Sequence, residues 1–275
     1  MKYKLIAFDL DGTFLDDEKN IPQRNMEALQ AAAEKGIHIA VATGRIMPGV
    51  PEAIRALPFI RYFICVNGAQ VYDRVENKVI YTAEIDEPTA QRVMEYMDTL
   101  PVIYDCYQDD CGWMSQEMYD RAEEFVTNPG ILRLVKGLRR PVPDLKVTLR
   151  EQGRSVQKQQ MFFKDIALRD RQLELLPDIF PELLFTTSVT NNIEINHADA
   201  AKGKALKALC SALGFSAEEA MAFGDGSNDI DMLESAGMGV AMANAIPAVL
   251  AAADYVTLTN NEAGVADAIE KLALR

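Results

Sequence analysis

Two aspartates, Asp9 and Asp11, follow directly after a short apolar run at residues 4–8. Residues two positions apart on extended backbone point to the same side, so the two carboxylates face one way. Two negative charges this close repel each other unless a cation lies between them. The pair therefore indicates a cation site, with a plain turn at Asp11-Gly12 as the alternative.

A third carboxylate, Asp225, ends a later apolar run at residues 220–223, and Asp229 lies one helical turn beyond it. Several carboxylates without histidine suit a hard cation such as Mg²⁺ and do not suit Zn²⁺. Asp225 or Asn228 could instead cap the following helix, and capping and metal binding do not exclude each other.

The segments that must position these acids alternate between strand and helix patterns. Apolar runs typical of strands lie at residues 4–8, 37–42, 62–66, 220–223, 239–242 and 255–258. Helical patterns lie at residues 22–36, 48–57, 202–213, from about 228, 246–252 and 264–274. This alternation predicts βαβ units and an α/β fold with a parallel sheet.

Four of the apolar runs end in polar residues: Asp9, Thr43, Asn67 and Asp225. Ligands of open parallel sheets bind beyond the carboxyl ends of the strands. If the four runs are parallel neighbours, their ends converge on one crevice. The alternative is that each polar residue only forms a turn.

The middle of the chain, residues 85–189, has a different pattern. Helical segments at 88–99, 115–127 and 170–177 are separated by strand-like runs at 101–107, 144–149, 159–163 and 182–187. We expect an inserted α+β domain over 85–189, a core domain formed by 1–84 and 190–275, and hinges near 83–86 and 188–192.

Composition narrows the function. The 275 residues include 41 acidic and 28 basic ones, a net charge of −13, which disfavours binding to nucleic acids and anionic membranes. No apolar run approaches the roughly 18 residues of a membrane span, and no signal peptide is visible. Four cysteines without a C-x-x-C pair favour buried thiols in a reducing compartment, so we expect a cytoplasmic protein. The oligomeric state stays open.

Four short motifs carry a resemblance to a known family. D9-L-D11-G-T13, T43-G-R45, K202-G and G224-D225-G-S-N228-D229 resemble, in order, the four motifs of haloacid dehalogenase-like phosphatases. The stretch from G224 to about residue 269 resembles the Cof-type branch, whose larger cap lies between the second and third motifs. The resemblance implies a Rossmann-like core with an α+β cap at 85–189.

It also implies catalytic roles. Asp9 resembles the nucleophile, Asp11 the general acid/base whose backbone carbonyl binds the metal, and Asp225 a direct Mg²⁺ ligand. Lys202 would place a positive charge between Asp9 and the transferring oxygens; an exposed helix-start lysine is its alternative. A proton on Asp11 at neutral pH requires a raised pKa, from burial or neighbouring carboxylates.

Further residues are assigned to phosphate binding or support. Thr43, the Gly44 amide and Arg45 resemble phosphate-binding groups, although Arg45 could be a surface residue. Asn228 would bind the phosphate or support the site through water, and Asp229 would support the Mg²⁺ site without being a direct ligand. Asn67-Gly68 would only shape the turn after the third strand. Ala201 departs from the branch, where Ser or Thr often precedes the motif lysine. His197 has no evident partner, so a role for it stays open.

We therefore expect a Mg²⁺-dependent phosphatase that acts on a small phosphorylated metabolite, a sugar phosphate first, through an aspartyl-phosphate. Alternatives are a phosphotransferase such as a phosphomutase, a phosphatase of pyridoxal phosphate or flavin mononucleotide, and a non-catalytic phospho-ligand-binding protein. A dinucleotide site at G224-D-G or G237-M-G is a weak reading, because Asp225 would repel a pyrophosphate and the glycine pattern is incomplete.

Overall fold

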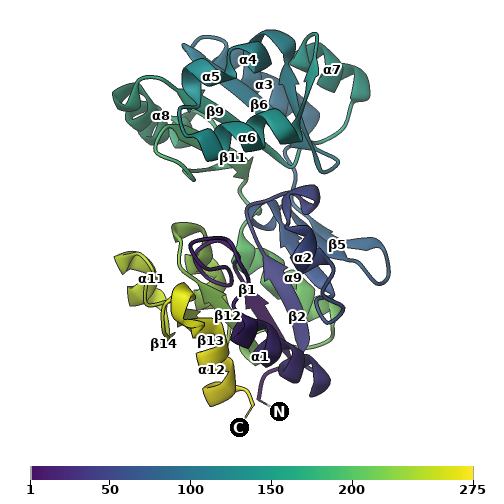
Figure 1. Ribbon diagram of the computed structural model, residues 1–275. Coiled ribbons are helices and arrows are strands. Elements are labelled where there is room, and N and C mark those ends of the chain that lie inside the picture. Colours follow the sequence, from purple (N-terminus) through teal and green to yellow (C-terminus); the bar gives the residue numbers. More distant parts are fainter. Residues whose placement is uncertain (1, 275) are drawn as a thin grey trace. The chain divides into compact units, whose positions relative to one another are not determined.

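The chain forms two compact units in a computed structural model that describes residues 2–274. One unit comprises Met1–Thr82 and Ala200–Arg275, and the other comprises Ala83–Asp199 (Figure 1). We call them the core domain and the inserted domain. The second crossing lies at Asp199, not at residue 189 as the sequence predicts, because β11 (Asn192–His197) pairs with β9 and β10 inside the inserted domain.

The core domain contains an eight-stranded sheet in the order β14-β13-β12-β1-β2-β3-β4-β5. Its strands are β1 Leu5–Phe8, β2 His38–Ala42, β3 Tyr62–Cys65, β4 Gln70–Asp73, β5 Lys78–Thr82, β12 Ala220–Gly224, β13 Met238–Ala241 and β14 Tyr255–Val256. All neighbours from β14 to β3 are parallel, whereas the β3–β4 and β4–β5 pairs are antiparallel. The central strands are continuous apolar runs because a parallel sheet is covered on both faces. The predicted α/β fold with a parallel-sheet core is confirmed.

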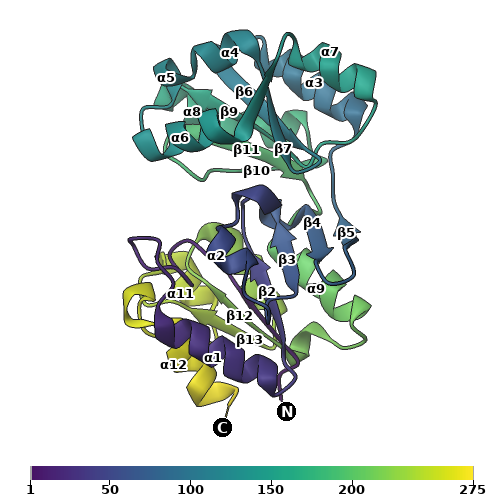
Figure 2. The same cartoon turned by 45° about the vertical axis from the view of Figure 1, so that its right-hand side comes forward.

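Helices connect these strands. They are α1 Gln23–Glu34, α2 Glu52–Arg55, α9 Lys202–Ala212, α10 Ile230–Ser235, α11 Pro247–Ala252 and α12 Gly264–Leu272, with short 3₁₀ turns η1 Met47–Gly49, η2 Val66–Gly68, η3 Ala217–Glu219, η4 Ser227–Asp229 and η5 Asn260–Glu262. Helices α9 and α10 bury apolar residues against the sheet, and α1 packs beside α12 (Figure 2). The helix predicted at 48–57 is reduced to η1 and α2, because Pro48 and Pro51 lack the N–H groups that would continue it.

The inserted domain has a six-stranded sheet in the order β10-β11-β9-β6-β7-β8. Its strands are β6 Val102–Gln108, β7 Cys111–Ser115, β8 Arg139–Val142, β9 Lys158–Phe163, β10 Leu183–Thr186 and β11, and its helices are α3 Glu87–Met97, α4 Gln116–Asp120, α5 Ala122–Phe125, α6 Pro129–Leu138, α7 Leu145–Gln152 and α8 Ile166–Ile179. One apolar cluster lies between the sheet and α3, α7 and α8, and a smaller one lies beneath α5 and α6.

One predicted strand of this domain is a helix. The sequence favours a strand at residues 144–149, but the structure forms α7 there. Asp144 caps the helix by accepting a hydrogen bond from the Val147 N–H, and Gly153 ends it in the left-handed region with φ 61°. Leu145 and Leu149 are buried one turn apart, so helical spacing and caps outweigh the local strand preference of Val147 and Thr148.

Within the described part of the chain, no helix combines the length and apolar character needed to cross a membrane. Within residues 2–274 no disulfide joins the four cysteines, and three of them are buried.

Candidate active site

The four polar strand ends meet at one edge of the core sheet. β12, β1, β2 and β3 are adjacent and parallel, so Asp225, Asp9, Thr43 and Asn67 follow their carboxyl ends in the same direction. Backbone hydrogen bonds continue the pairing past the strands: the Asp9 N–H donates to Phe223 O, and the Thr43 N–H donates to Ile64 O. The convergence of polar strand ends that the sequence pattern predicts is therefore present in the sheet topology.

Three carboxylates form a compact cluster at this edge. Asp9, Asp225 and Asp229 each offer an oxygen within 4.8 Å of the others. Both Asp229 oxygens are engaged: Oδ1 accepts from Lys202, and Oδ2 accepts from the N–H groups of Asp225 and Gly226, each at 3.0 Å. Asp229 thereby holds the backbone that carries Asp225, while Asp9 and Asp225 supply oxygens to the space between them.

Lys202 is the first residue of α9 and is fully buried, which excludes the alternative of an exposed helix-start lysine. Its Nζ donates to Asp9 Oδ1 at 2.7 Å and to Asp229 Oδ1 at 2.5 Å. Burial lowers the pKa of this ammonium, but the charges of Asp229 and Asp9 outweigh burial and raise the pKa above its ordinary value. The lysine is therefore a fixed positive charge between two acids.

The carboxylates carry more negative charge than Lys202 neutralises. Burial raises the pKa of Asp9 to about 7, with Lys202 opposing and Asp229 and Asp225 adding to the rise. Burial likewise raises the pKa of Asp225 to about 6, against the hydrogen bond that the Thr13 hydroxyl donates to Oδ1 at 2.6 Å. A cation bound between these carboxylates would reduce their mutual repulsion, and ligand atoms that are all oxygens fit Mg²⁺.

Asp11 is held in an ion pair that the sequence does not predict. Arg45 donates from Nε and Nη2 to both carboxylate oxygens, at 2.9 and 2.8 Å, and Lys19 Nζ lies 2.9 Å from Oδ1. Burial raises the pKa of Asp11, but the charges and hydrogen bonds of Arg45 and Lys19 outweigh it and hold the pKa below its usual range. The expected raised pKa of Asp11 is therefore wrong for this arrangement, since the acid must leave these cations before it holds a proton.

The loops after β2 and β3, which carry Thr43, Gly44 and Asn67, contact each other beside Asp11 and Arg45. The Thr43 hydroxyl accepts a hydrogen bond from the Arg45 N–H at 3.3 Å. A Cβ on Gly44 would lie 2.8 Å from Asn67 Oδ1, so a larger residue there would have to displace the Asn67 carboxamide. Asn67 takes a left-handed φ of 56°, and its Oδ1 accepts from Asn228 Nδ2 at 3.0 Å. Asn228 thus contacts the loop after β3 through Asn67.

Sequence reasoning misses two side chains of this site. Thr13 stands inside the first motif, and its contact with Asp225 becomes visible only when loop and strand meet. Lys19 carries no sequence signal, because a lysine in an acidic loop is ordinarily exposed. His197 lies at the end of β11 in the inserted domain, where its Nδ1 accepts from the Asp199 N–H at 3.1 Å, a local turn contact.

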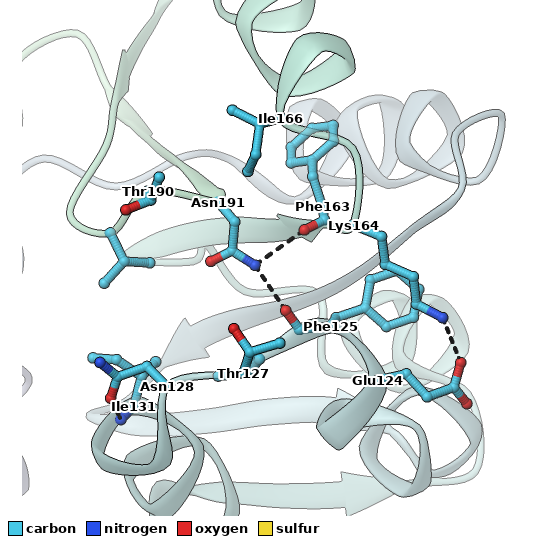
Figure 3. Close-up of a pocket in the computed structure, with 12 residues that line it drawn as sticks. Glu124, Phe125, Thr127, Asn128, Ile131, Phe163, Lys164, Ile166, Thr190 and Asn191 are labelled. Atoms are coloured by element: carbon cyan, nitrogen blue, oxygen red, sulfur yellow. Dashed lines mark hydrogen bonds and ion pairs between the residues drawn. The ribbon is translucent and has the colours of Figure 1, made fainter.

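The inserted domain has a pocket of its own, of about 560 Å³ (Figure 3). Asn191 spans it and donates from Nδ2 to Phe125 O at 2.7 Å and Phe163 O at 3.0 Å, while Lys164 pairs with Glu124 at the rim. None of the site residues predicted from the sequence lines this pocket. The chemistry-bearing groups are concentrated at the edge of the core sheet.

Comparison with known proteins agrees with this geometry. The model of the haloacid dehalogenase-like hydrolase family matches residues 6–269. The 5-amino-6-(5-phospho-D-ribitylamino)uracil phosphatase YcsE of Bacillus subtilis is 33% identical over 98% of this chain and 96% of its own length. The putative phosphatase YxeH of the same organism is 33% identical, with 99% of both chains covered.

Solved structures show the same fold. A haloacid dehalogenase-like hydrolase from Bacteroides thetaiotaomicron superimposes with a TM-score of 0.83 at 29% identity, covering 98% of this chain and 99% of its own. The subclass IIB sugar phosphatase BT4131 superimposes with a TM-score of 0.81 at 25% identity, covering 99% of this chain and 100% of its own. By its sequence motifs, its fold and the family model that spans nearly all of it, the chain belongs to the haloacid dehalogenase-like hydrolase family.

Proposed function

We propose that the chain is a Mg²⁺-dependent phosphatase that hydrolyses a small phosphorylated metabolite through an aspartyl-phosphate on Asp9. One observation carries this proposal: Lys202 bridges Asp9 and Asp229, and Asp225 completes a set of carboxylates within 4.8 Å. A nucleophilic carboxylate, a fixed cation and an oxygen-donor metal site are the parts that phosphoryl transfer to an aspartate needs.

In the first step, a carboxylate oxygen of Asp9 attacks phosphorus. Lys202 fixes Oδ1, which leaves Oδ2 as the attacking atom. The new O–P bond forms as the bond from phosphorus to the leaving oxygen breaks, and the leaving oxygen takes a proton from Asp11. Mg²⁺ held by Asp9, Asp225 and the Asp11 carbonyl would supply charge neutralisation for the incoming phosphoryl group.

In the second step, water hydrolyses the aspartyl-phosphate. Asp11, now ionised, accepts a proton from the attacking water, the O–P bond to Asp9 breaks, and inorganic phosphate leaves. Arg45 links this cycle to the substrate, because its guanidinium holds Asp11 and suits phosphate oxygens equally well. If Arg45 moved its hydrogen bonds from Asp11 to the phosphate, Asp11 would be released to donate and accept protons.

The substrate class we propose is the phosphate ester of a sugar or of a polyhydroxylated chain. The names of two similar proteins support it, one a phosphatase of a phosphoribityl compound and one a sugar phosphatase. We propose that the inserted domain is the cap that selects the leaving group. The absence of disulfides among the described cysteines is compatible with a reducing, cytoplasmic location.

The decisive experiment replaces Asp9 by Asn and measures phosphate release from 4-nitrophenyl phosphate with Mg²⁺. Loss of activity supports the nucleophile, with Asp254→Asn as a control at a distant acid of the core domain. Full activity of the Asp9 variant would refute covalent catalysis. A panel of phosphorylated metabolites ranked by kcat/KM then identifies the substrate.

The same panel separates the other functions. Transfer of phosphate to an added phosphosugar in preference to release would indicate a phosphotransferase. A preference for pyridoxal phosphate or flavin mononucleotide would indicate a cofactor phosphatase, and no release from any compound would indicate a binding protein.

A further inference from the structure

In the segment that carries Asp11, backbone N–H groups donate hydrogen bonds to carbonyls of the same segment. In the loop formed by residues 10–17, which we call loop 10–17, the Phe14 N–H donates to Asp9 O at 3.2 Å and the Leu15 N–H donates to Leu10 O at 2.9 Å. Phe14 and Leu15 are buried, so their backbone carbonyls need hydrogen-bond donors from elsewhere in the chain.

Asparagine amides from three different segments supply those donors. Asn244 Nδ2 donates to Gly12 O at 2.8 Å, Asn25 Nδ2 to Phe14 O at 3.2 Å and Asn260 Nδ2 to Leu15 O at 3.0 Å. Asn25 belongs to α1, Asn244 follows β13, and Asn260 begins η5. Two of these contacts join positions more than 200 residues apart in the chain.

The asparagines are also joined to each other and to the end of the loop. Asn244 Oδ1 accepts from the Asn260 N–H at 2.9 Å, and Asn260 Nδ2 also donates to Asp17 Oδ1 at 3.0 Å. Asn261 exchanges two hydrogen bonds with Asp17, at 3.0 and 2.9 Å. The Asn244 carboxamide, the Asn260 backbone N–H and the Asn260 Nδ2 therefore form one connected network from Gly12 to Asp17.

A carboxamide suits this place for a physical reason. It supplies both a donor and an acceptor without charge. A lysine or arginine here would be drawn to the neighbouring carboxylates, and an aspartate could not donate to a carbonyl. The network thus fixes the loop without disturbing the electrostatics of the site.

Residues of loop 10–17 are in direct contact with Asp225, so the position of the loop affects the groups proposed to react. Thr13, held within the loop, donates from Oγ1 to Asp225 Oδ1 at 2.6 Å, and a Cβ on Gly12 would lie 2.3 Å from Asp225 Oδ2. A displaced loop would therefore move Asp11 and an oxygen of Asp225 together. We propose that Asn244 and Asn260 are positioning residues that hold loop 10–17 in register with Asp225 for phosphoryl transfer, an inference that rests on the proposed phosphatase function.

The test uses Asn244→Ala, at an exposed side chain, and Asn260→Asp, at a buried one. Its control is Asp254→Ala, because Asp254 is also exposed and also makes a 2.8 Å hydrogen bond to the core-domain backbone, at the Gly239 N–H, away from the loop. Misplacement of reacting groups by about 1 Å costs on the order of 10²-fold in rate. We expect each asparagine variant to lower kcat for 4-nitrophenyl phosphate by about tenfold or more, with KM within about twofold, while Asp254→Ala keeps kcat within about twofold at a similar loss in Tm.

Hydrogen exchange supplies a readout that does not depend on activity. The Phe14 and Leu15 amides should exchange faster in Asn244→Ala, while amides of β1 and β12 keep their protection. Unchanged exchange in the loop, or faster exchange with unchanged kcat, would overturn the inference. If the wild-type protein releases no phosphate from any ester, the proposed function fails, and loop exchange alone then decides whether the asparagines hold the loop.

Discussion

Lys202 and Asp229 form a buried ion pair, 2.5 Å from Nζ to Oδ1, although they are 27 positions apart in the chain. The pair places a protonated amine between Asp9, the proposed nucleophile, and the residue that holds the Asp225 backbone. One cation therefore orders three acids, and removing it should have consequences for both folding and chemistry.

Replacement of Lys202 by Met should damage both properties. It leaves two buried carboxylates without their cation, which costs about 3–5 kcal/mol when one partner of a buried pair is lost. It also removes the charge next to the transferring oxygens, so we expect kcat to fall by about 10²–10³-fold. Urea unfolding and phosphate release measure the two effects, with the exposed Lys207→Met on the same helix as the control. Equal behaviour of the two variants would contradict this assignment.

Metal binding should stabilise the core domain. Because Asp9 and Asp225 repel each other in the free protein, Mg²⁺ should raise Tm in proportion to the logarithm of its concentration. Asp225→Asn should abolish this shift, since it removes one of the two carboxylates that supply oxygens to the cation. Thermal unfolding with and without a chelator is the measurement, and Asp231→Asn, whose wild-type carboxylate caps the Gly203 N–H, is the control. A Mg²⁺ response retained by the Asp225 variant would place the cation elsewhere.

Arg45 should not be replaceable by lysine. Its guanidinium makes two hydrogen bonds to Asp11 and a third to Gly49 O at 3.0 Å, a planar arrangement that an ammonium cannot reproduce. We expect Arg45→Lys to lower kcat/KM by about 10–100-fold, corresponding to about 1–3 kcal/mol for charge-assisted hydrogen bonds. Lys19→Ala should cost about threefold or less, because ion pairs of exposed lysines contribute little. A larger loss from Lys19→Ala than from Arg45→Lys would reverse the assignment.

The sequence predicts the strand ends of this site and the charge of Lys202 beside Asp9, but not the ion pairs of Asp11. Asp9, Thr43, Asn67 and Asp225 are predictable because the direction of parallel strands sends their ends to one edge. The pairing of Asp11 with Lys19 is not, because it depends on how loop 10–17 and the residues after it fold back, through contacts with segments near the other end of the chain.

Two features of the inserted domain are also not predicted by the local sequence. The helix α7 was open to prediction from its own caps, Asp144 and Gly153, but its β-branched residues favour a strand locally. The second domain crossing depends on the pairing of β11 with β9, which lies about 30 residues earlier in the chain, and no local composition marks it.

An ion pair outside the site should set acid sensitivity of the core domain. Burial raises the pKa of Asp73, but hydrogen bonds from Arg61 and from the Glu76 and Val75 N–H groups outweigh it and hold the pKa below its ordinary 3.8. The folded state therefore binds this proton less readily than the unfolded state, so the stabilisation is present above about pH 4 and is lost as pH falls through the lowered pKa. Asp73→Asn should cost about 1–3 kcal/mol at pH 7, and the difference from wild type should shrink toward pH 3. Glu76→Gln, at a more exposed partner of Arg61, is the control in urea unfolding at each pH, and a pH-independent difference for Asp73→Asn would contradict the linkage.

Two glycines of the core domain allow backbone strain to be separated from an effect on the site. Gly12 and Gly36 both have a φ of +85°, a left-handed conformation that costs an alanine about 1–2 kcal/mol. A Cβ on Gly12 would meet Asp225 Oδ2 at 2.3 Å, whereas a Cβ on Gly36 meets nothing within 4 Å. We therefore expect similar strain in Gly12→Ala and Gly36→Ala but a selective loss of kcat and of the Mg²⁺-induced rise in Tm in Gly12→Ala. Because the strain is matched, a Gly12→Ala protein that retained full activity would show that Asp225 tolerates displacement, and the tight packing of loop 10–17 against it would then have no catalytic purpose.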